Sequence, residues 1–230
     1  MKVIGLLGGM SWESTVPYYQ VINETVREQL GGLHSAKIVL FSVDFAEIEE
    51  MQVAGRWDEA GALLAKAAAA VDRAGADFLV ICTNTMHIIA DQIAKALTIP
   101  ILHIADTTAA VMKKANVRTV GLLATKFTME KDFYRSRIEA NGFRVLVPDP
   151  DDRLLVHRII YDELCLGRIE ETSRQQYRRV IDRLVAAGAE GIIFGCTEVG
   201  LLVGPSDSSV PVFDTTAIHA RAAAELAIKA

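Results

Sequence analysis

The stretch Ala187-Gly-Ala-Glu-Gly-Ile-Ile-Phe-Gly-Cys-Thr-Glu198 decides the fold, because it is an apolar run that ends in a thiol and two polar residues. The upstream segment Ala74-Gly-Ala-Asp-Phe-Leu-Val-Ile-Cys-Thr-Asn-Thr85 has the same layout. One offset of 113 residues matches Ala-Gly-Ala to Ala-Gly-Ala (187 − 74) and also matches Thr83 to Cys196 (196 − 83). These matches indicate that the chain consists of two copies of one unit.

Two further repeated segments support a duplication. Ile4-Gly-Leu-Leu7 recurs as Val120-Gly-Leu-Leu123 at an offset of 116 (120 − 4), and Ile99-Pro-Ile-Leu102 recurs as Val210-Pro-Val-Phe213 at an offset of 111 (210 − 99). Offsets that drift by a few residues are what loop insertions leave when strands and helices are retained. Three matches in the same order therefore indicate an internal repeat, whereas one match would be weak evidence.

Length and composition exclude several classes of protein. The 230 residues are 51% hydrophobic, yet no apolar run approaches the roughly 20 residues that cross a bilayer. The three cysteines, Cys82, Cys165 and Cys196, are too few and too scattered for a disulfide framework, which favours a reducing cytoplasm. A net charge of −5 provides no basic surface for nucleic acid. We therefore expect a cytoplasmic protein that binds a small molecule, and neither nucleic acid nor a membrane.

Short apolar runs alternate with helical segments along the chain. Runs typical of buried strands cover residues 3–7, 36–43, 77–82, 117–123, 144–147, 191–194 and 210–213. Helices are predicted at 57–73, at 85–97, from about 128, within 152–166 and 171–187, and at 216–229. This alternation predicts an α/β fold with parallel sheets that helices cover on both faces. With the repeat, it predicts two pseudo-symmetric lobes at 1–104 and 105–214, and a C-terminal helix at 215–230 that packs back on the N-terminal lobe.

The loops after the strands are the expected place for a site, because ligands bind outside the carboxyl ends of parallel strands. Residues 8–11, 82–85, 124–126 and 196–198 all follow predicted strands. Pseudo-twofold packing of the lobes would bring Thr83 and Cys196 face to face. The sequence therefore predicts an active site in a cleft between the lobes.

The turn Gly8-Gly-Met-Ser-Trp-Glu-Ser14 connects the first strand to a helix, with Ser11 or Ser14 as its expected cap and Pro17 in its first turn. Such a junction presents free N–H groups to an anion. Two glycines also serve a tight turn, and the sequence leaves both interpretations open. The dinucleotide pattern Gly-x-Gly-x-x-Gly is not completed here.

The cysteines have different expected roles. Cys196 lies where a strand gives way to a helix, whose N-terminus would stabilise a thiolate, although a free cysteine is often a small buried hydrophobe instead. Cys82 adjoins Thr83, and side chains alternate along a strand, so Cys82 should point into the core if Thr83 faces the site. We expect Cys165 to pack within a lobe or to lie at the cleft rim.

The residues that follow the paired positions have two possible roles. Asn84, Thr85, Thr197 and Glu198 could bind the carboxylate and amino groups of a substrate, or could cap the helices that follow.

Other polar residues are expected to be structural. His87 lies one helical turn beyond Thr83 and could tune the site, but a structural role is favoured. Asp214 is expected to cap the last helix, and His219 has no evident catalytic partner. No cluster has the spacing of metal ligands, so no metal is assigned.

Four motifs, Gly8-Gly-Met-Ser, Thr83-Asn-Thr-Met-His87, Gly195-Cys-Thr-Glu198 and Asp214-Thr-Thr-Ala-Ile-His219, are spread over essentially the whole chain. In this combination the chain resembles the aspartate/glutamate racemase family. The resemblance implies two α/β lobes, no cofactor, a homodimer, and one residue from each lobe beside the substrate's α-carbon. In particular the chain is similar to the racemases specific for L-aspartate and L-glutamate, which have threonine and cysteine in those positions.

Carried over by position, the resemblance makes Cys196 and Thr83 catalytic. It places six further residues around the substrate: Met10, Gln52, Asn84, Thr85, Thr197 and Glu198. The chain departs from the commoner family pattern, in which a cysteine occupies the position of Thr83. Some aspartate racemases also have a lysine near the position of Cys165, and its absence here leaves the partner of the distal carboxylate open.

The resemblance implies racemisation of aspartate or glutamate without pyridoxal phosphate. Cys196 would remove the α-proton of the L-enantiomer, and Thr83, which is a poor base, would supply a proton to the opposite face. Rival enzymes are similar to maleate isomerases, hydantoin racemases and arylmalonate decarboxylases, which use related lobes on other acids. A non-catalytic carboxylate-binding module is the alternative from a different class.

Overall fold

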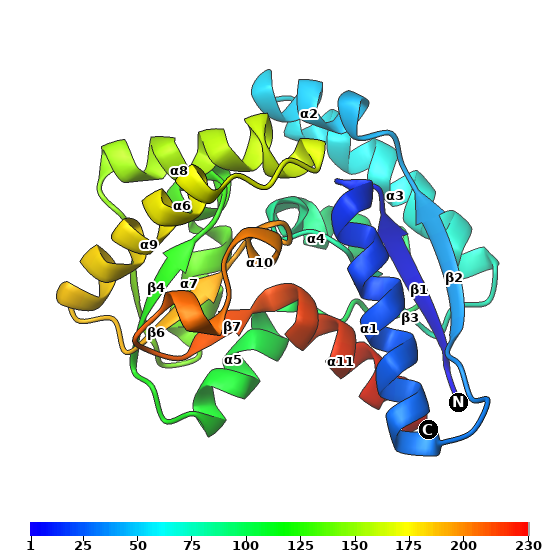
Figure 1. Cartoon of the computed structure of the whole chain (residues 1–230). Coiled ribbons are helices and arrows are strands. Elements are labelled where there is room, and N and C mark those ends of the chain that lie inside the picture. The colour runs from blue at the N-terminus through cyan, green and yellow to red at the C-terminus, as the bar shows by residue number, and fades with distance from the viewer. Residues whose placement is uncertain (230) are drawn as a thin grey trace. The chain divides into compact units, whose positions relative to one another are not determined.

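The computed structural model describes residues 1–229, which form two compact units (Figure 1). Unit 1 comprises residues 1–104 and the chain from His219 onward, and unit 2 comprises residues 105–218. The chain therefore passes between the units twice, after Ile104 and after Ile218. Within residues 1–229, no helix combines the length and the apolar character that a membrane crossing requires.

Unit 1 contains a parallel three-stranded sheet in the order β2-β1-β3. Its strands are β1 (Val3–Gly8), β2 (Lys37–Ser42) and β3 (Phe78–Ile81). Its helices are α1 (Trp12–Leu30), α2 (Phe45–Val53), α3 (Trp57–Arg73), η1 (Thr85–Ile89), α4 (Ala90–Ala94) and the part of α11 (Thr215–Ile228) from His219 onward. Apolar residues of α1 and α11 form one buried cluster with the sheet, and those of α2 and α3 form another. Helices thus cover both faces, as predicted.

Unit 2 contains a parallel four-stranded sheet in the order β5-β4-β6-β7. Its strands are β4 (Thr119–Leu123), β5 (Arg144–Leu146), β6 (Gly191–Phe194) and β7 (Val212–Asp214). Its helices are α5 (Ile104–Lys114), α6 (Lys126–Glu130), α7 (Asp132–Ala140), α8 (Pro150–Asp162), η2 (Leu164–Leu166), α9 (Glu171–Ala186), α10 (Val199–Leu202), η3 (Pro205–Asp207) and the first residues of α11. Every run predicted as a strand forms one, with ends that shift by at most two residues.

The internal repeat is visible in equivalent backbone hydrogen bonds. The Leu79 N–H donates to the Pro100 carbonyl at 2.9 Å in unit 1, and the Ile192 N–H donates to the Pro211 carbonyl at 2.9 Å in unit 2. The orders β2-β1-β3 and β5-β4-β6 also correspond. The two units differ at the fourth strand. In unit 1 the segment equivalent to β7 makes only an isolated bridge, from Ile101 to Leu79.

Several predicted helices have different bounds. The single helix expected at 85–97 is the 3₁₀ helix η1 followed by the short α4, and the helix expected from about 128 is α6 and α7 with an extended residue, Lys131, between them. The helices α2 and α5 were not predicted. Pro17 lies in the second turn of α1, because the helix already begins at Trp12.

The two glycines after β1 make a tight turn. Gly9 has φ +87°, and a Cβ there would collide with the backbone of Val43. A Cβ on Gly8 would lie 2.5 Å from Thr15 Cγ2. The Gly9 N–H donates to Thr15 Oγ1 at 2.8 Å, so this donor is used within the fold. Ser11 occupies the N-cap position of α1 as expected, but its side chain makes no capping hydrogen bond. The tight-turn interpretation is therefore favoured.

Candidate active site

Cys196 lies just beyond β6 in unit 2, and its side chain is buried. The preceding Gly195 continues the pairing with β4, because its N–H donates to the Leu123 carbonyl at 2.7 Å. A Cβ on Gly195 would lie 2.6 Å from Leu122 Cδ1, so glycine permits this close approach without a shift of the leucine side chain. The sequence thus delivers Cys196 to the carboxyl end of its sheet, as predicted.

Two side chains converge on one carboxylate oxygen beside Cys196. Cys196 Sγ donates to Glu198 Oε2 at 2.9 Å, and Thr197 Oγ1 donates to the same atom at 2.8 Å. All three residues are buried. An ionised carboxylate can only accept hydrogen bonds, so the arrangement suits a charged Glu198 and a protonated thiol. Glu198 is therefore placed to take the thiol proton.

The prediction that a helix N-terminus keeps Cys196 as a thiolate is wrong. Burial raises the pKa of the Cys196 thiol well above its usual value, and the negative charges of Glu198 and Cys165 raise it further. The helix α10 begins at Val199 and has four residues, so its dipole is small. The raised pKa favours the thiol over the thiolate, so Cys196 would need an adjacent base in order to act as one.

Tyr177, which the sequence pattern does not single out, lies close enough to this pair for their charges to affect its pKa. Its side chain is fully buried on α9, and burial, followed by the charges of Cys196 and Glu198, raises its pKa. Its hydroxyl donates to the Val156 carbonyl at 3.3 Å. Helical periodicity marks such a residue as core, so no sequence signal distinguishes it. Cys165 carries a half-buried thiol close enough to affect the pKa of both groups.

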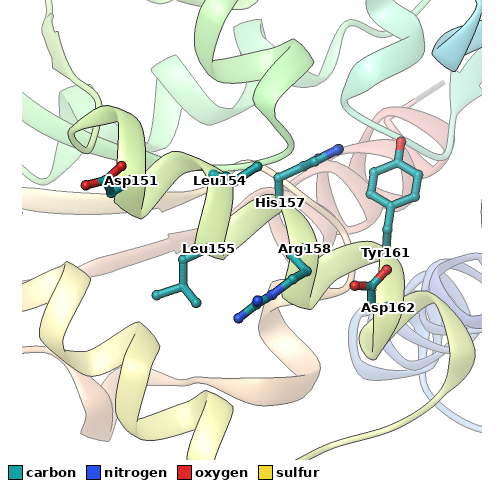
Figure 2. A pocket seen from close by; sticks show the side chains of 7 residues that line it. All are labelled: Asp151, Leu154, Leu155, His157, Arg158, Tyr161 and Asp162. Atoms are coloured by element: carbon teal, nitrogen blue, oxygen red, sulfur yellow. The ribbon is translucent and has the colours of Figure 1, made fainter.

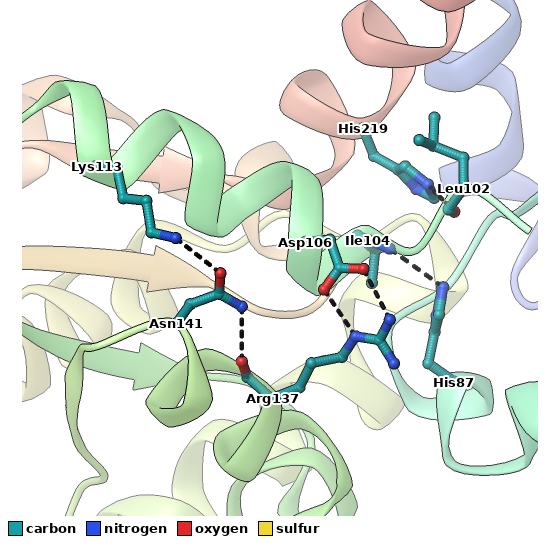
Figure 3. A network of polar contacts seen from close by, with 8 residues as sticks. All are labelled: His87, Leu102, Ile104, Asp106, Lys113, Arg137, Asn141 and His219. Atoms are coloured by element: carbon teal, nitrogen blue, oxygen red, sulfur yellow. Dashed lines mark hydrogen bonds and ion pairs between the residues drawn. The ribbon is translucent and has the colours of Figure 1, made fainter.

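Thr83 lies at the equivalent place in unit 1, and it is also buried. His87 Nδ1 donates to the Thr83 carbonyl at 2.8 Å, which assigns the proton to Nδ1. The other ring nitrogen, Nε2, accepts from the Ile104 N–H at 3.4 Å (Figure 3). His87 therefore fixes the Thr83 backbone to the segment where the chain leaves unit 1.

Cys82 is confirmed as a core residue. Its side chain is fully buried in the cluster that contains Ile4 and Leu6, and burial raises the pKa of its thiol far above the usual range. Its Sγ lies 3.8 Å from the Val80 carbonyl oxygen. Neither property suits a reactive thiol.

The remaining predicted residues of unit 1 are buried near the carboxyl end of the sheet. Met10 and Met86 pack in the buried cluster that contains apolar residues of α2 and α3. Gln52 Nε2 donates to Met86 Sδ at 3.0 Å. Asn84 and Thr85 are buried at the start of η1.

The structure argues against the capping alternative for two predicted binding residues. Asn84 and Glu198 occupy the N-cap positions of η1 and α10, but neither side chain makes a capping hydrogen bond. In contrast, Asp214 is confirmed as a cap of α11, because its Oδ1 accepts from the N–H groups of Thr216 at 2.9 Å and Ala217 at 3.2 Å.

The predicted site residues therefore form two groups. Unit 1 holds Met10, Gln52, Thr83, Asn84 and Thr85, and unit 2 holds Cys196, Thr197 and Glu198. The facing of Thr83 and Cys196 stays a prediction. Across residues 1–229, no three His, Cys, Asp or Glu side chains are grouped as a metal site requires.

A separate hollow of ≈ 520 Å³ runs along α8 in unit 2 (Figure 2). It is lined by Asp151, Leu154, Leu155, His157, Arg158, Tyr161 and Asp162. The His157 ring lies 4.7 Å from that of Tyr161 and 5.7 Å from that of Phe127. Burial, followed by the charge of Lys126, lowers the pKa of His157. The hollow contains none of the predicted site residues.

His219 is a structural residue of unit 1. Its Nε2 donates to the Leu102 carbonyl at 2.8 Å (Figure 3), and its Nδ1 lies 2.9 Å from the Tyr18 hydroxyl, from which it accepts. Burial lowers the pKa of His219 from 6.5 to about 4. The ring is therefore neutral in the folded protein at neutral pH.

This shift predicts that mild acid destabilises the protein. Between pH 6.5 and about 4 the unfolded chain binds a proton on His219 that the folded chain does not. The free energy of unfolding therefore decreases as the pH is lowered through this window. The loss from this group amounts to about 3 kcal/mol across that window. Urea titrations at several pH values should show a shallower pH dependence for His219→Gln than for wild type. The exposed His34 provides a control, since His34→Gln should leave the slope unchanged. An unchanged slope in His219→Gln would contradict this assignment.

The fold and the site together define a class of protein. A duplicated α/β chain with a buried thiol beside a carboxylate at a strand end suits an enzyme that moves protons. The family model described as Asp/Glu/hydantoin racemase matches residues 7–223, so the chain belongs to that family. The predicted family and the predicted enzyme class, a racemase, are thereby confirmed.

Solved structures and a curated relative agree with this placement. A crystal structure of a proposed Asp/Glu racemase from Yersinia pestis is 59% identical, with a TM-score of 0.91 over 99% of this chain and 100% of that chain. An aspartate racemase homologue from Pyrococcus horikoshii OT3 is 35% identical, with a TM-score of 0.85 over the same shares. The broad specificity amino-acid racemase RacX of Bacillus subtilis is 22% identical over 226 residues, which is 95% of each chain.

Proposed function

We propose that the protein racemises an acidic amino acid, aspartate or glutamate, with the L-enantiomer preferred and without a cofactor. The observation that carries the proposal is the buried contact of 2.9 Å between Cys196 Sγ and Glu198 Oε2. It supplies a thiol with an adjacent acceptor for its proton, which removal of a weakly acidic α-proton requires. The names of the relatives from Yersinia pestis and Pyrococcus horikoshii support the substrate class.

The proposed reaction begins with the unit 2 pair. The thiol proton moves from Cys196 to Glu198, and the thiolate then takes the α-proton of the L-enantiomer. The electron pair of the C–H bond passes into the substrate's carboxylate as an enediolate. Burial disfavours the thiolate, so the proposed sequence requires a proton acceptor beside the thiol while the thiolate exists.

Thr83 completes the reaction in the proposal. Its hydroxyl gives a proton to the opposite face of the α-carbon and receives one from water in the same step, because its alkoxide is too basic to persist. Cys196 is again a thiol once it holds the α-proton, and Glu198 gives its proton to the hydroxide that this water leaves, which restores the resting site. The reaction requires the two units to close on one substrate, with one of these groups on each side of the carbon.

The developing negative charge needs donors that do not reorganise. Backbone N–H groups and side chains at the starts of η1 and α10 can supply them, and these segments contain Asn84, Thr85 and Thr197. The side chains of Asn84 and Glu198 do not cap their helices. This leaves the predicted binding role for Asn84 and favours the base role for Glu198.

The two directions of the reaction are linked. Enantiomers have equal free energies in water, so the equilibrium constant is one and kcat/KM must be equal in both directions. A thiol on one face and a hydroxyl on the other can therefore give the two directions different kcat values and different KM values. The ratio kcat/KM stays the same in both directions. The L-to-D direction should be the easier one to observe.

The substrate class is tested by steady-state assays with each candidate acid. Chiral chromatography should show conversion of L-aspartate or L-glutamate. A hydantoin, an arylmalonate and maleate test the rival enzymes. Turnover of one of these compounds without any turnover of acidic amino acids would replace the proposal with that activity. Binding of an acidic amino acid without turnover would indicate the non-catalytic module.

Exchanging Thr83 for cysteine tests whether threonine is the weaker member of the pair. We expect Thr83→Cys to exchange the α-proton of the D-enantiomer faster and to bring the two kcat values closer, because both faces would then have a thiol. Thr83→Ala should lower racemisation more than α-proton exchange from the L-enantiomer, because the hydroxyl supplies the second proton. The measurement is α-deuterium uptake by NMR beside chiral chromatography. A correctly folded Thr83→Cys with unchanged exchange of the D-enantiomer would show that Thr83 does not face the α-carbon.

A further inference from the structure

Two buried histidine rings bind backbone groups where a strand pairing of unit 1 stops (Figure 3). The Leu102 N–H donates to the Leu79 carbonyl at 2.9 Å, which attaches this segment to β3. The Leu102 carbonyl then accepts from His219 Nε2 at 2.8 Å, and the Ile104 N–H donates to His87 Nε2 at 3.4 Å. Ile104 is the last residue before the chain leaves unit 1. The ring of His87 is therefore attached to the start of that crossing.

The His87 ring makes a backbone contact through each of its nitrogens. Nδ1 donates to the Thr83 carbonyl at 2.8 Å, and Nε2 accepts from the Ile104 N–H. A carbonyl can only accept and a backbone N–H can only donate, so the two contacts together require a neutral ring with its proton on Nδ1. A ring protonated on both nitrogens would point an N–H at the Ile104 N–H and lose that contact.

The contact with His87 completes the attachment of the Thr83 backbone. The Thr83 N–H donates to the Ile81 carbonyl at 2.9 Å, at the end of β3, and the Thr83 carbonyl accepts from His87. With both groups held, the direction of the Cα–Cβ bond of Thr83 is fixed. Its hydroxyl can then move only by rotation about χ1, among a few staggered positions. Without His87, only the N–H side of this residue would keep the hydrogen bond described here.

The internal repeat shows that the fold does not require a histidine at this place. The offset of 113 residues pairs His87 with Gly200 in unit 2 (200 − 87). The offset of 111 pairs its neighbour His103, whose ring lies 4.4 Å from that of His87, with Asp214 (214 − 103). Gly200 and Asp214 are neighbours too, since a Cβ on Gly200 would lie 2.7 Å from Asp214 Oδ2. Unit 2 thus builds the same junction without an imidazole, which favours a role for His87 in the chemistry of unit 1.

We propose that His87 is a positioning residue for Thr83. Its neutral ring, braced by the Ile104 N–H, holds the Thr83 carbonyl and so aims the hydroxyl for delivery of a proton to the α-carbon. The inference rests on the proposed function, in which Thr83 is that proton donor. The first proton transfer belongs to Cys196 and Glu198 and does not involve His87. Loss of the contact with Thr83 should therefore impair the second transfer and spare the first.

Two amide substitutions separate the contacts of the ring. The amide nitrogen of His87→Asn replaces Nδ1 and can donate to the Thr83 carbonyl, whereas the amide oxygen of His87→Gln replaces Nε2 and can accept from the Ile104 N–H. We expect His87→Gln to lower formation of the D-enantiomer by about 10-fold or more, while α-deuterium uptake by the L-enantiomer changes by less than about 3-fold. His87→Asn should keep formation of the D-enantiomer within about 3-fold of wild type.

The matched control is His219→Gln. His219 is also a buried ring of unit 1, but it contacts the Leu102 carbonyl and the Tyr18 hydroxyl and makes no hydrogen bond to Thr83. Its substitution should leave the ratio of D-enantiomer formed to α-deuterium taken up as it is in wild type. A merely structural role for His87 would lower both rates together and would not change this ratio. Circular dichroism establishes that each variant is folded.

Nitrogen-15 NMR of the histidine rings tests the geometry without any substrate. The contacts assign the Nδ1–H tautomer to His87 and the Nε2–H tautomer to His219, and each glutamine variant identifies its signal by removing it. An Nε2–H tautomer for His87, an unchanged ratio in His87→Gln, or a His87→Asn as impaired as His87→Gln would overturn the role of His87 in an enzyme that still racemises. Absence of α-deuterium with the wild type would instead refute the proposed function, and this role with it.

Discussion

Replacing Cys196 with serine is expected to lower α-proton exchange from L-aspartate and L-glutamate by about 1,000-fold or more. A serine hydroxyl is a far weaker acid than a thiol, so Glu198 cannot convert it to a useful base. The side chain remains of similar size, and the buried position should stay packed. Deuterium uptake at the α-carbon, followed by NMR in heavy water, measures the loss.

The matched control is Cys82→Ser, which changes the thiol beside Thr83 instead. Cys82 is buried among apolar side chains and has no proposed contact with the substrate. Its serine variant should retain most of the exchange activity, even if the protein loses some stability. Exchange that persists in Cys196→Ser would remove Cys196 from the role of base.

The second large effect is expected for Glu198→Gln, with kcat lowered by about 100-fold or more and KM changed much less. The amide keeps the shape of the side chain but cannot accept the thiol proton. The same change should lower the pKa of Cys196, because the carboxylate's negative charge and its hydrogen bond both raise that pKa. The pH dependence of iodoacetamide alkylation measures it, and the alkylation profile should shift to lower pH.

This pair of readouts separates the base role of Glu198 from its predicted role in substrate binding. A binding residue would raise KM and would not couple to the thiol's titration. Thr197→Val provides the control, because it removes the other donor to Glu198 Oε2 and leaves the thiol contact in place. If Glu198→Gln keeps full kcat, or leaves the alkylation profile where it is, the proposed proton transfer is wrong.

The sequence predicts the fold well because the signals are local and repeated. Apolar runs such as residues 191–194 are too short for helices, and the same Ala-Gly-Ala segment precedes the equivalent run in both units. The repeat then places Thr83 and Cys196 at equivalent strand ends without any knowledge of the structure. The core position of Cys82 could be predicted because side chains alternate along a strand and Cys82 adjoins Thr83.

The chemistry of the site could not be predicted in the same way. The contact of Cys196 with Glu198 depends on how the backbone turns after β6, which the sequence motif does not specify. The preference for thiol over thiolate depends on burial and on the length of α10, neither of which the motif specifies. The pairing of Tyr18 with His219 joins residues 201 positions apart, and no local pattern marks it.

Incubation of the wild type with L-aspartate or L-glutamate in deuterated water tests the proposed racemisation. The α-carbon is followed by NMR and the enantiomers by chiral chromatography. We expect the D-enantiomer to appear with deuterium at the α-carbon, and the recovered L-enantiomer to gain deuterium as well. Absence of α-deuterium from both acids, with the protein folded and able to bind them, would contradict it.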